Sequence, residues 1–327
     1  MDGGNRERGA EVSVIIPVRN DPRVSDCVRS IVALRDEVAA LQVIVVDHSS
    51  SEEFGRDVLA CLPGAVSVLR FEGATVYGAR AAGVAEATGE VLLFTDADCV
   101  VRPGWLAEPL RAFRRGADLV QGHSGSLGRS RSDALIQRRY EAHLSRLRPG
   151  EGTECDTRNL AVHRRVFGEV GFPVDWRRTG DTYLGLMAEA AGFRVAYWPA
   201  MRVDHRHDTD LAMFVAKQIC HGWGAQRIMR EHPEAQWHGG HLRFVARIAR
   251  SSARLPGQHR MAGVLGGTMV RGGGLLDRLK PVLPAPIAGV MLLILDKGAA
   301  LAGHLLFEAG GEEPRLSDIV GRADVVG

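Results

Sequence analysis

EVLLFTDAD, residues Glu90–Asp98, joins a short apolar run directly to two acidic side chains. Residues Glu90–Thr95 have the length and the apolar character of a strand that is buried on both faces. Similar runs occur earlier in the chain, VSVIIPV at Val12–Val18 and QVIVV at Gln42–Val46, and Ser67–Phe71 is a further strand candidate. The first part of the chain is therefore predicted to supply four strands.

Helical patterns separate these strands. Ser25–Leu34 carries apolar residues at helical spacing, and Tyr77–Ala87 is rich in alanine and ends before Gly89. Strands that alternate with helices in this way predict an α/β fold, with a mostly parallel sheet covered by helices on both faces. In such sheets ligands bind at the carboxyl ends of the strands. Asp47 and the Asp96–Asp98 pair both follow strands, so two acidic groups are predicted at the same edge of the sheet.

The remainder of the chain is more mixed and becomes mainly helical. The predicted elements are helices at Ala134–Leu147, Arg164–Val170 and Thr182–Ala191, strands at Asn159–Val162 and Phe193–Trp198, and helices from Leu211 onward. Residues 251–274 are expected to be rich in loops, and the polar tail after Gly310 is expected to be mobile. These patterns divide the chain into a flexible N-terminus at residues 1–10, an α/β domain at residues 11–232 and a mainly helical extension at residues 233–327.

The composition is that of a soluble globular protein. Apolar residues make up 45% of the 327 residues, charged residues make up 24%, and the net charge is only +2. A protein that binds nucleic acid needs a basic surplus or stripe, so the charge balance argues against nucleic acid as a partner. Five cysteines without CxxC spacing argue against a disulfide framework or a zinc site, and they favour a reducing, cytoplasmic setting.

The most apolar segment of the C-terminal region is Ile287–Leu306, and Asp296 and Lys297 interrupt it near its middle. Charged residues at the centre of a bilayer are costly, so a membrane span is not expected. Peripheral docking on the inner face of a membrane stays open, and so does the formation of a homodimer.

The Asp96-Ala97-Asp98 triplet is the strongest local signal for chemistry. Two carboxylates one residue apart repel each other, and a hard cation such as Mn²⁺ or Mg²⁺ would offset that repulsion. The same cation would bridge the oxygens of a diphosphate. A solvated turn or a helix cap is the alternative interpretation, since Asp-x-Asp also occurs in loops by chance.

Three other positions have both a functional and a structural interpretation. The carboxylate of Asp47 can accept a hydrogen bond from a nucleobase or a ribose, or it can form an Asx turn. Asp181 precedes a predicted helix, where it can be a general base for an acceptor hydroxyl or an N-cap. His205 can ligate a metal and Arg206 can hold a phosphate, whereas the structural alternative makes His205 and His207 a pair of surface histidines.

The order and spacing of these motifs resemble the family 2 inverting glycosyltransferases, which have the GT-A fold. The matching segments are VSVIIPVRND (Val12–Asp21), VIVVDHSS (Val43–Ser50), GARAAGVAEATGEVLLFTDADCVVRPGWL (Gly78–Leu106), TRNLAVHRRVFGEVG (Thr157–Gly171), TGDTYLGLMAEAAGFRV (Thr179–Val195) and VDHRH (Val203–His207). The resemblance extends from about Val12 to Arg230, so residues 11–232 would form the glycosyltransferase domain.

The resemblance implies a set of residues that hold a nucleotide-diphosphate sugar. This set would be Pro17, Val18, Arg19, Asp47, Arg80, Asp96, Ala97, Asp98, Arg158 and Asn159. Within it, Asp47 would contact the base and Arg80 would lie near the base or the diphosphate. Asp98 would bind the Mn²⁺ or Mg²⁺ ion directly, and Asp96 would be shared between the ribose and the metal.

The family also implies a reaction. Asp181 would be the catalytic base, and His205 would lie near the diphosphate as a further metal ligand. The sugar would move in a single displacement that inverts its anomeric centre. A UDP-sugar is favoured as the donor over GDP- and dTDP-sugars. The motifs leave the acceptor open between a small molecule, a peptide, a glycan and a lipid carrier.

Some positions depart from the family pattern. His48, Ala81 and Gly180 replace an acid, an asparagine and a glutamate, and Tyr183 stands where many members have a second acid. The Gln-x-x-Arg-Trp motif of processive synthases is absent from the sequence, which favours a non-processive enzyme. One alternative is a nucleotidyltransferase, although Arg19–Pro22 lacks the glycines of its phosphate loop. Another is a non-catalytic scaffold that binds a nucleotide sugar.

Overall fold

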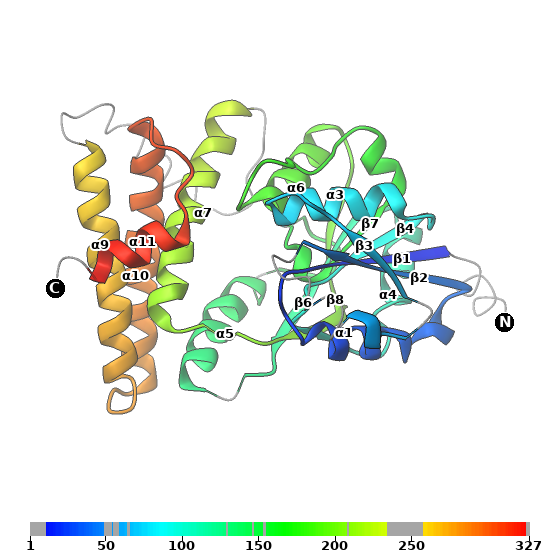
Figure 1. Cartoon of the computed structure of the whole chain (residues 1–327), viewed down its shortest axis with the longest axis horizontal. Coiled ribbons are helices and arrows are strands. Elements are labelled where there is room, and N and C mark those ends of the chain that lie inside the picture. Colours follow the sequence, from blue (N-terminus) through cyan, green and yellow to red (C-terminus); the bar gives the residue numbers. More distant parts are fainter. Residues whose placement is uncertain are drawn as a thin grey trace. The chain divides into compact units, whose positions relative to one another are not determined.

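The computed structural model describes residues 11–48, 54, 59–63, 66–128, 130–145, 147–152, 155–207, 209–233 and 258–324. The chain divides into two compact units (Figure 1). The first consists of Met1–Leu127 and Leu147–Arg206, and the second consists of Gly128–Arg146 and His207–Gly327. The expected flexible segment at residues 1–10 lies outside the described residues.

Among the described residues, an eight-stranded mixed sheet forms the centre of the first unit. Its strands are β1 (Glu11–Val18), β2 (Ala40–Asp47), β3 (Val66–Arg70), β4 (Val91–Phe94), β5 (Cys99–Val101), β6 (Leu119–Ser126), β7 (Leu160–His163) and β8 (Val195–His205), in the order β3-β2-β1-β4-β7-β6-β8-β5. β1 pairs in parallel with β2 and β4, and β2 with β3. Only β7 and β5 run against their neighbours in this described sheet, which confirms the prediction of a mostly parallel sheet.

Helices cover both faces of this sheet (Figure 1). On one face lie α1 (Val24–Val32) and α4 (Glu108–Arg114), and on the other lie α3 (Val76–Glu86) and α6 (Gly180–Ala190). Short 3₁₀ helices are η2 (Arg35–Glu37), η3 (Leu59–Cys61), η4 (Thr157–Asn159) and η5 (Arg164–Gly168). The helix predicted at Arg164–Val170 is therefore a 3₁₀ helix, and α4, β5 and β6 are elements that the sequence patterns did not indicate.

The residues of β1 explain why its sequence is apolar without interruption. Successive side chains of a strand point to opposite faces of the sheet. Val14 and Ile16 share one core with Val28 of α1, whereas Ile15 lies beneath Gly83 of α3, where an added Cβ would come within 2.5 Å of the Ile15 Cγ2. Both faces of β1 are thus buried, as predicted for this strand.

The described part of the second unit consists of helices. They are α5 (Arg131–Leu144), α7 (Leu211–Glu231), α9 (Gln258–Leu279), α10 (Ala285–Glu308) and α11 (Leu316–Asp324). Val215 and Ile219 of α7 share an apolar core with Leu292 of α10. The backbones of α7 and α10 approach so closely at Gly222 and Gly303 that a Cβ on either glycine would overlap the other helix. The prediction of a mainly helical C-terminal region is confirmed.

The division between the units differs from the boundary expected at residue 232. α5 and α7 belong to the second unit, because Leu135, Ile136 and Val215 join the core of the C-terminal helices. The loops expected within residues 251–274 are corrected for residues 258–274, which belong to α9. Part of the tail expected to be mobile forms α11.

Packing explains why a glycine-rich segment is helical in α9. Glycine disfavours a helix interior by about 1 kcal/mol relative to alanine. Here Gly272 lies against Leu295 of α10, where a Cβ would come within 2.6 Å of the leucine Cδ2, and Gly273 lies against the backbone of Ala212. The glycines therefore allow close helix packing, which compensates for their low helix propensity.

Candidate active site at the carboxyl edge of the sheet

The predicted acidic residues meet at the carboxyl ends of strands in the first unit. Asp47 ends β2. Asp96 and Asp98 follow β4 in a tight turn, in which the N–H of Cys99 donates to the carbonyl of Asp96 at 3.1 Å. His205 ends β8 and pairs in register with Cys99 of β5. The fold thus brings residues from distant parts of the sequence to one edge of the sheet, as the strand pattern predicted for the aspartates.

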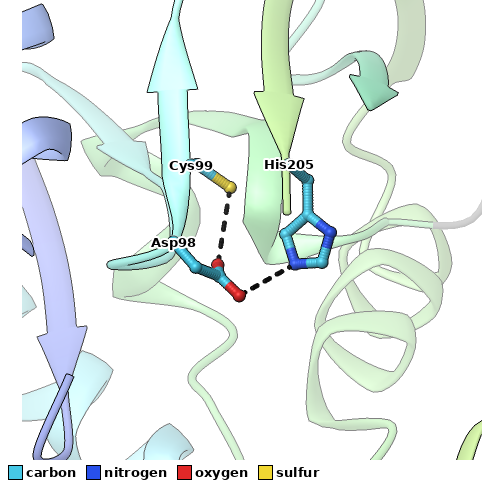
Figure 2. A group of neighbouring side chains, drawn as sticks. All are labelled: Asp98, Cys99 and His205. Atoms are coloured by element: carbon cyan, nitrogen blue, oxygen red, sulfur yellow. Dashed lines mark hydrogen bonds and ion pairs between the residues drawn. The ribbon is translucent and has the colours of Figure 1, made fainter. Parts of the chain in front are cut away.

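Asp98, Cys99 and His205 form a group that could hold a metal ion (Figure 2). One ligand atom from each of the three lies within 4.8 Å of the others. His205 Nε2 is 3.1 Å from Asp98 Oδ2, and Cys99 Sγ is 3.9 Å from Asp98 Oδ1. Burial, helped by the two neighbouring aspartates, raises the pKa of the Cys99 thiol well above its usual range, and a protonated thiol is a poor ligand. The remaining carboxylate and imidazole suit a divalent cation such as Mn²⁺.

The neighbours of Asp98 lower the pKa of its carboxyl group. Burial acts to raise the pKa of Asp98, but the hydrogen bond and charge of His205, followed by the charges of Arg23 and Arg158, lower it overall. Arg23 Nη2 is 3.8 Å from Asp98 Oδ2 and 2.6 Å from Asp21 Oδ2. An ionised, partly exposed carboxylate is therefore ready to bind a cation. Arg23 itself was not identified from the sequence.

Asp96 has a different partner from Asp98. Its Oδ1 accepts a hydrogen bond of 2.6 Å from Nη2 of the buried Arg80. Burial raises the pKa of Asp96, and the charge of Arg80 opposes this rise. Of the three residues expected to bind the metal, Asp98 and His205 are in contact, whereas Asp96 is engaged by Arg80.

Asp181 accepts hydrogen bonds from three residues around it. Its Oδ1 accepts from the hydroxyl of Tyr77 at 3.1 Å and from the N–H of Thr182 at 3.0 Å. Its Oδ2 accepts from the N–H of Thr157 at 3.3 Å. Burial and then the charge of Asp156 raise the pKa of Asp181. A fixed carboxylate with a raised pKa has the properties of a general base.

The start of α6 argues against an N-cap role for Asp181. The helix begins at Gly180, and its N-cap residue is Thr179, whose φ of 60° is in the left-handed region. Asp181 therefore lies inside the first turn, two positions further into the helix than the predicted N-cap. A Cβ at Gly180 would lie 2.7 Å from Cδ2 of Tyr77, which explains why this chain has glycine where the family often has glutamate.

Tyr77 and Arg80 connect the two carboxylates of the site. They are three residues apart on α3 and therefore share one face of the helix. Tyr77 donates to Asp181, and Arg80 pairs with Asp96 while its guanidinium lies over the Tyr77 ring, 5.4 Å from the centroid. Burial, followed by the charge of Asp181, raises the pKa of Tyr77, so the hydroxyl keeps its proton. Tyr77 was not identified from the sequence, because a buried aromatic residue on a helix belongs to no motif.

Asp156 and Arg158 form a second ion pair near these carboxylates. Arg158 Nε lies 2.9 Å from Asp156 Oδ2 and 3.0 Å from Oδ1. Burial acts to raise the pKa of Asp156, but Arg158 lowers it to about 2. The charge of Asp156 acts on both Asp96 and Asp181, so the predicted Arg158 belongs to the same cluster. The Asp-x-Arg spacing beside TRNLAVH is the signal that could have indicated Asp156.

Asn159 has a structural role, and its expected contact with the donor stays a prediction. Its side chain is fully buried. The amide Nδ2 donates to the carbonyls of His123 at 2.8 Å and Met201 at 3.0 Å, and Oδ1 accepts from Trp105 Nε1 at 2.9 Å. These bonds use the amide to link β6, β8 and the segment before α4. Ala97 is also buried, with 6% of its surface exposed.

The ends of β1 and β2 form the expected base-binding side of the site. Pro17 and Val18 are buried and pair in register with Val46 and Asp47, whereas Arg19 is exposed. Asp47 is itself buried, and its Oδ2 is 2.9 Å from Nη1 of Arg70. Any contact between Asp47 and a base therefore involves Arg70 too, a residue that the sequence did not indicate.

His48 is the one departure from the family pattern on this side of the site. Its Nδ1 is buried and has no hydrogen-bond partner. Burial lowers the pKa of His48 to about 4, and the charges of Arg19 and Arg80 act in the same direction. The imidazole is therefore neutral at neutral pH, where a second acid would carry a negative charge.

Comparison with known proteins agrees with this geometry. Residues 13–171 match the sequence model of the family described as Glycosyl transferase family 2. The chain is 26% identical over 198 residues to the glycosyltransferase AglE of Haloferax volcanii, covering 57% of this chain and 64% of that protein. It is 29% identical over 237 residues to the pre-mycofactocin glycosyltransferase of Mycobacterium tuberculosis, covering 68% of this chain and 48% of that protein. The chain thus spans less than two-thirds of the length of these relatives.

A solved structure is similar at a lower level. It is the crystal structure of GalNAc-T7 with UDP, GalNAc and Mn²⁺, with a TM-score of 0.48 and 18% identity over 62% of this chain and 44% of that chain. The family match and the sheet described above do not depend on this likeness. The mixed sheet, the aspartates at its carboxyl edge and the family match lead to one conclusion: residues 13–171 match a family 2 glycosyltransferase domain, and the sheet that contains them is GT-A-like.

Proposed function

We propose that the chain is a metal-dependent, non-processive glycosyltransferase that moves a sugar from a nucleotide-diphosphate sugar, with inversion at the anomeric carbon. One observation carries the proposal. An ionised Asp98 in contact with His205 lies in the same cluster as Asp181, a partly buried carboxylate with the properties of a base. Tyr77 and Arg80 join the two halves of this cluster.

The donor would bind along the carboxyl edge of the sheet. Asp98 and His205 would hold a Mn²⁺ or Mg²⁺ ion, which when bound would offset the negative charge of the diphosphate. Arg23 lies within 3.8 Å of Asp98 and would add positive charge beside the same phosphates. Asp47 and Arg70 would face the base. A UDP-sugar is the proposed donor, as the family resemblance favours, and the N–H and carbonyl groups of uracil would complement this pair.

Asp181 would accept the proton of the acceptor nucleophile. Its two oxygens are fixed by Tyr77, Thr182 and Thr157, so the carboxylate is already oriented before the acceptor binds. The raised pKa strengthens it as a base. The new bond forms as the nucleophile attacks the anomeric carbon, and the bond to the diphosphate breaks on the opposite side. Attack from that side inverts the anomeric centre.

The acceptor would bind near Asp181. Tyr183 is two residues after Asp181, is partly exposed and packs against the buried Trp176 with the ring centres 5.1 Å apart. Aromatic faces are common in sites that bind sugars or other flat apolar groups. Tyr183 occupies the position of the second acid in many family members. We therefore propose an acceptor without a positive charge. We also propose a cytoplasmic location, because the proposed donor is a nucleotide sugar and such donors are made in the cytoplasm.

A panel of donors tests this function. The purified chain is incubated with UDP-, GDP- and dTDP-sugars in the presence of Mn²⁺ or Mg²⁺, and release of the nucleotide and the shift in melting temperature are measured. We expect slow hydrolysis of one donor and a rise in melting temperature, because a bound ligand stabilises the folded state. A panel in which no donor is cleaved and none shifts the melting temperature would overturn the proposal. A donor that shifts the melting temperature but is never cleaved would favour a binding scaffold instead.

A further inference from the structure

The α9–α10 hairpin of the second unit exposes an unusual amount of apolar surface. Nine of the eleven large apolar side chains that are strongly exposed among the described residues belong to it. They are Met261, Val264, Leu275, Leu279, Val282, Ile287, Val290, Leu293 and Ile294. Val282, in the loop that joins the two helices, is 78% exposed. Single exposed apolar residues are ordinary, but a group of this size marks an interaction surface.

The positions of these residues follow the period of a helix. On α10, Ile287, Val290 and Ile294 are spaced by three and four residues, so they form a continuous stripe on its exposed side. The opposite side of α10 is buried at Ala288, Leu292 and Leu295. We call the nine exposed residues the hairpin patch. α9 and α10 are neighbours in the second unit (Figure 1), and the loop at their junction carries the most exposed member of the patch.

The exposed charged residues beside the hairpin patch are positively charged. Arg271 and Arg278 lie on the same exposed stripe of α9 as Leu275. Between residues 258 and 307 the sequence has only two acidic residues, Asp277 and Asp296. Asp277 pairs with Lys280 at 2.7 Å, and Asp296 is buried. The exposed side of the hairpin is therefore apolar and positive.

An anionic lipid surface fits this combination. The apolar side chains would enter the boundary between headgroups and acyl chains, while arginines beside them would contact lipid phosphates. Long basic side chains reach the headgroups while their aliphatic stems lie on apolar surface. We propose that the hairpin patch docks this protein peripherally on a membrane that contains anionic lipids. The proposal does not depend on the reaction proposed above.

The buried side of α10 supports docking over crossing. α10 is a described helix that is long and apolar enough to cross a membrane, by length and composition alone, and 44% of its most apolar window is buried inside the protein. Asp296 in its middle is 3.3 Å from Lys297 Nζ and 2.9 Å from Arg139 Nε of α5. Insertion would have to pull this ion pair apart or carry it into lipid, which is costly. The exposed stripe can reach a membrane while the ion pair stays in place.

Flotation with vesicles tests the proposal. The full chain is mixed with vesicles of phosphatidylcholine alone or with equal parts of phosphatidylcholine and phosphatidylglycerol. We expect binding to the anionic vesicles only, and we expect added salt to weaken it. Equal binding to both kinds of vesicle, or binding to neither, would overturn the proposal. Binding that survives extraction with alkaline carbonate would also overturn it, because that result indicates an inserted helix.

Three variants separate the contributions. Val282→Glu combined with Ile287→Glu should weaken vesicle binding at least about tenfold, since two apolar side chains no longer enter the lipid. Arg271→Gln combined with Arg278→Gln should weaken it roughly 25-fold and reduce its dependence on salt. Val174→Glu is the matched control, because Val174 is an exposed valine of the first unit, and it should bind like the parent protein.

Stability and oligomeric state complete the test. Every residue that these three variants change is exposed, so each variant should keep the melting temperature of the parent protein. A large loss of stability in the Val282 and Ile287 variant would mean that another part of the chain covers the patch. A parent dimer that this variant converts to monomers, measured by light scattering, would assign the patch to a second copy. Either result would overturn membrane docking.

Discussion

Two carboxylates, one in each unit of this chain, differ in how far the protein encloses them. In the first unit, Asp98 keeps 21% of its side chain exposed and contacts His205 and Arg23. In the second unit, Asp296 is only 3% exposed and lies between Arg139 and Lys297. A carboxylate at an open strand end can gain a ligand, whereas a carboxylate enclosed by helices can only hold its neighbours. The comparison separates a site for chemistry from a structural ion pair.

The largest effect is expected from Asp181→Asn. The amide cannot accept a proton, so we expect transfer to fall by about 100- to 10,000-fold, as measured by the rate of product formation with saturating donor. Binding of UDP, measured by calorimetry, should be unchanged. Weakened UDP binding together with a lower melting temperature would instead give Asp181 the structural role that Asp296 has in the second unit.

The second effect concerns His304, a fully buried histidine of α10 whose Nδ1 lies 2.6 Å from Gln226 Oε1. Burial lowers the pKa of His304 to about 4, below the value of about 6.5 in an unfolded chain. The unfolded chain therefore takes up the proton first as the pH falls, and stability is lost between pH 6.5 and pH 4, by about 3 kcal/mol in full.

His304→Gln tests this pH dependence. The variant should show a flatter curve of unfolding free energy against pH over that window, as measured by urea denaturation. His48 has a pKa shifted in the same direction, so some acid sensitivity should stay in the variant. An unaltered curve would show that His304 is not protonated on unfolding in this range.

A smaller loss of stability is expected from Arg139→Met. Removing one partner of a buried ion pair leaves an uncompensated charge, and the usual cost is several kcal/mol. Because Lys297 remains 3.3 Å from Asp296, we expect a loss of about 2 kcal/mol in unfolding free energy. UDP binding should not change. Arg29→Met is the control, since the Arg29–Asp26 pair is exposed and should contribute less than about 1 kcal/mol. Equal losses in both variants would contradict the distinction drawn between buried and exposed pairs.

The smallest effect is expected from Tyr77→Phe. The variant loses the hydrogen bond of 3.1 Å to Asp181, and this bond favours the charged carboxylate, so the pKa of Asp181 should rise further. Since a base must be deprotonated, the acid side of the rate–pH profile should move to higher pH. At neutral pH the rate should fall about fivefold, corresponding to about 1 kcal/mol for one hydrogen bond. A profile identical to that of the parent protein would remove Tyr77 from the positioning of the base.

The sequence predicts the parts of this structure that local pattern decides. β1, β2 and β4 are apolar on both faces, so their presence and the acids at their ends could be inferred. β6, with the sequence LVQGHSGS, was missed because six of its eight residues are small or polar. It forms a strand by pairing with β7 and β8. The glycines of α9 indicated loops because their packing against α7 and α10 is a property of the tertiary structure.

The residues of the candidate site also fall into those that local motifs indicate and those that only the tertiary structure shows. Asp47, Asp98 and Asp181 could be found because each belongs to a motif at the end or start of an element. The contact between Tyr77 and Asp181 joins residues 104 positions apart, and no local pattern indicates it. Asn159 shows the opposite case: a residue within a family motif turns out to be buried and to hold strands together.

Titration of UDP tests the central claim that the strand-end cluster of the first unit is a metal-dependent site for a nucleotide. Calorimetry is carried out on the parent protein and on Asp98→Asn, each with Mn²⁺ and with a chelator. We expect the parent protein to bind UDP at least about tenfold more tightly with Mn²⁺, and Asp98→Asn to bind weakly under both conditions, because one charged ligand to the cation is lost. Tight, Mn²⁺-dependent binding of UDP by a folded Asp98→Asn variant would contradict the account.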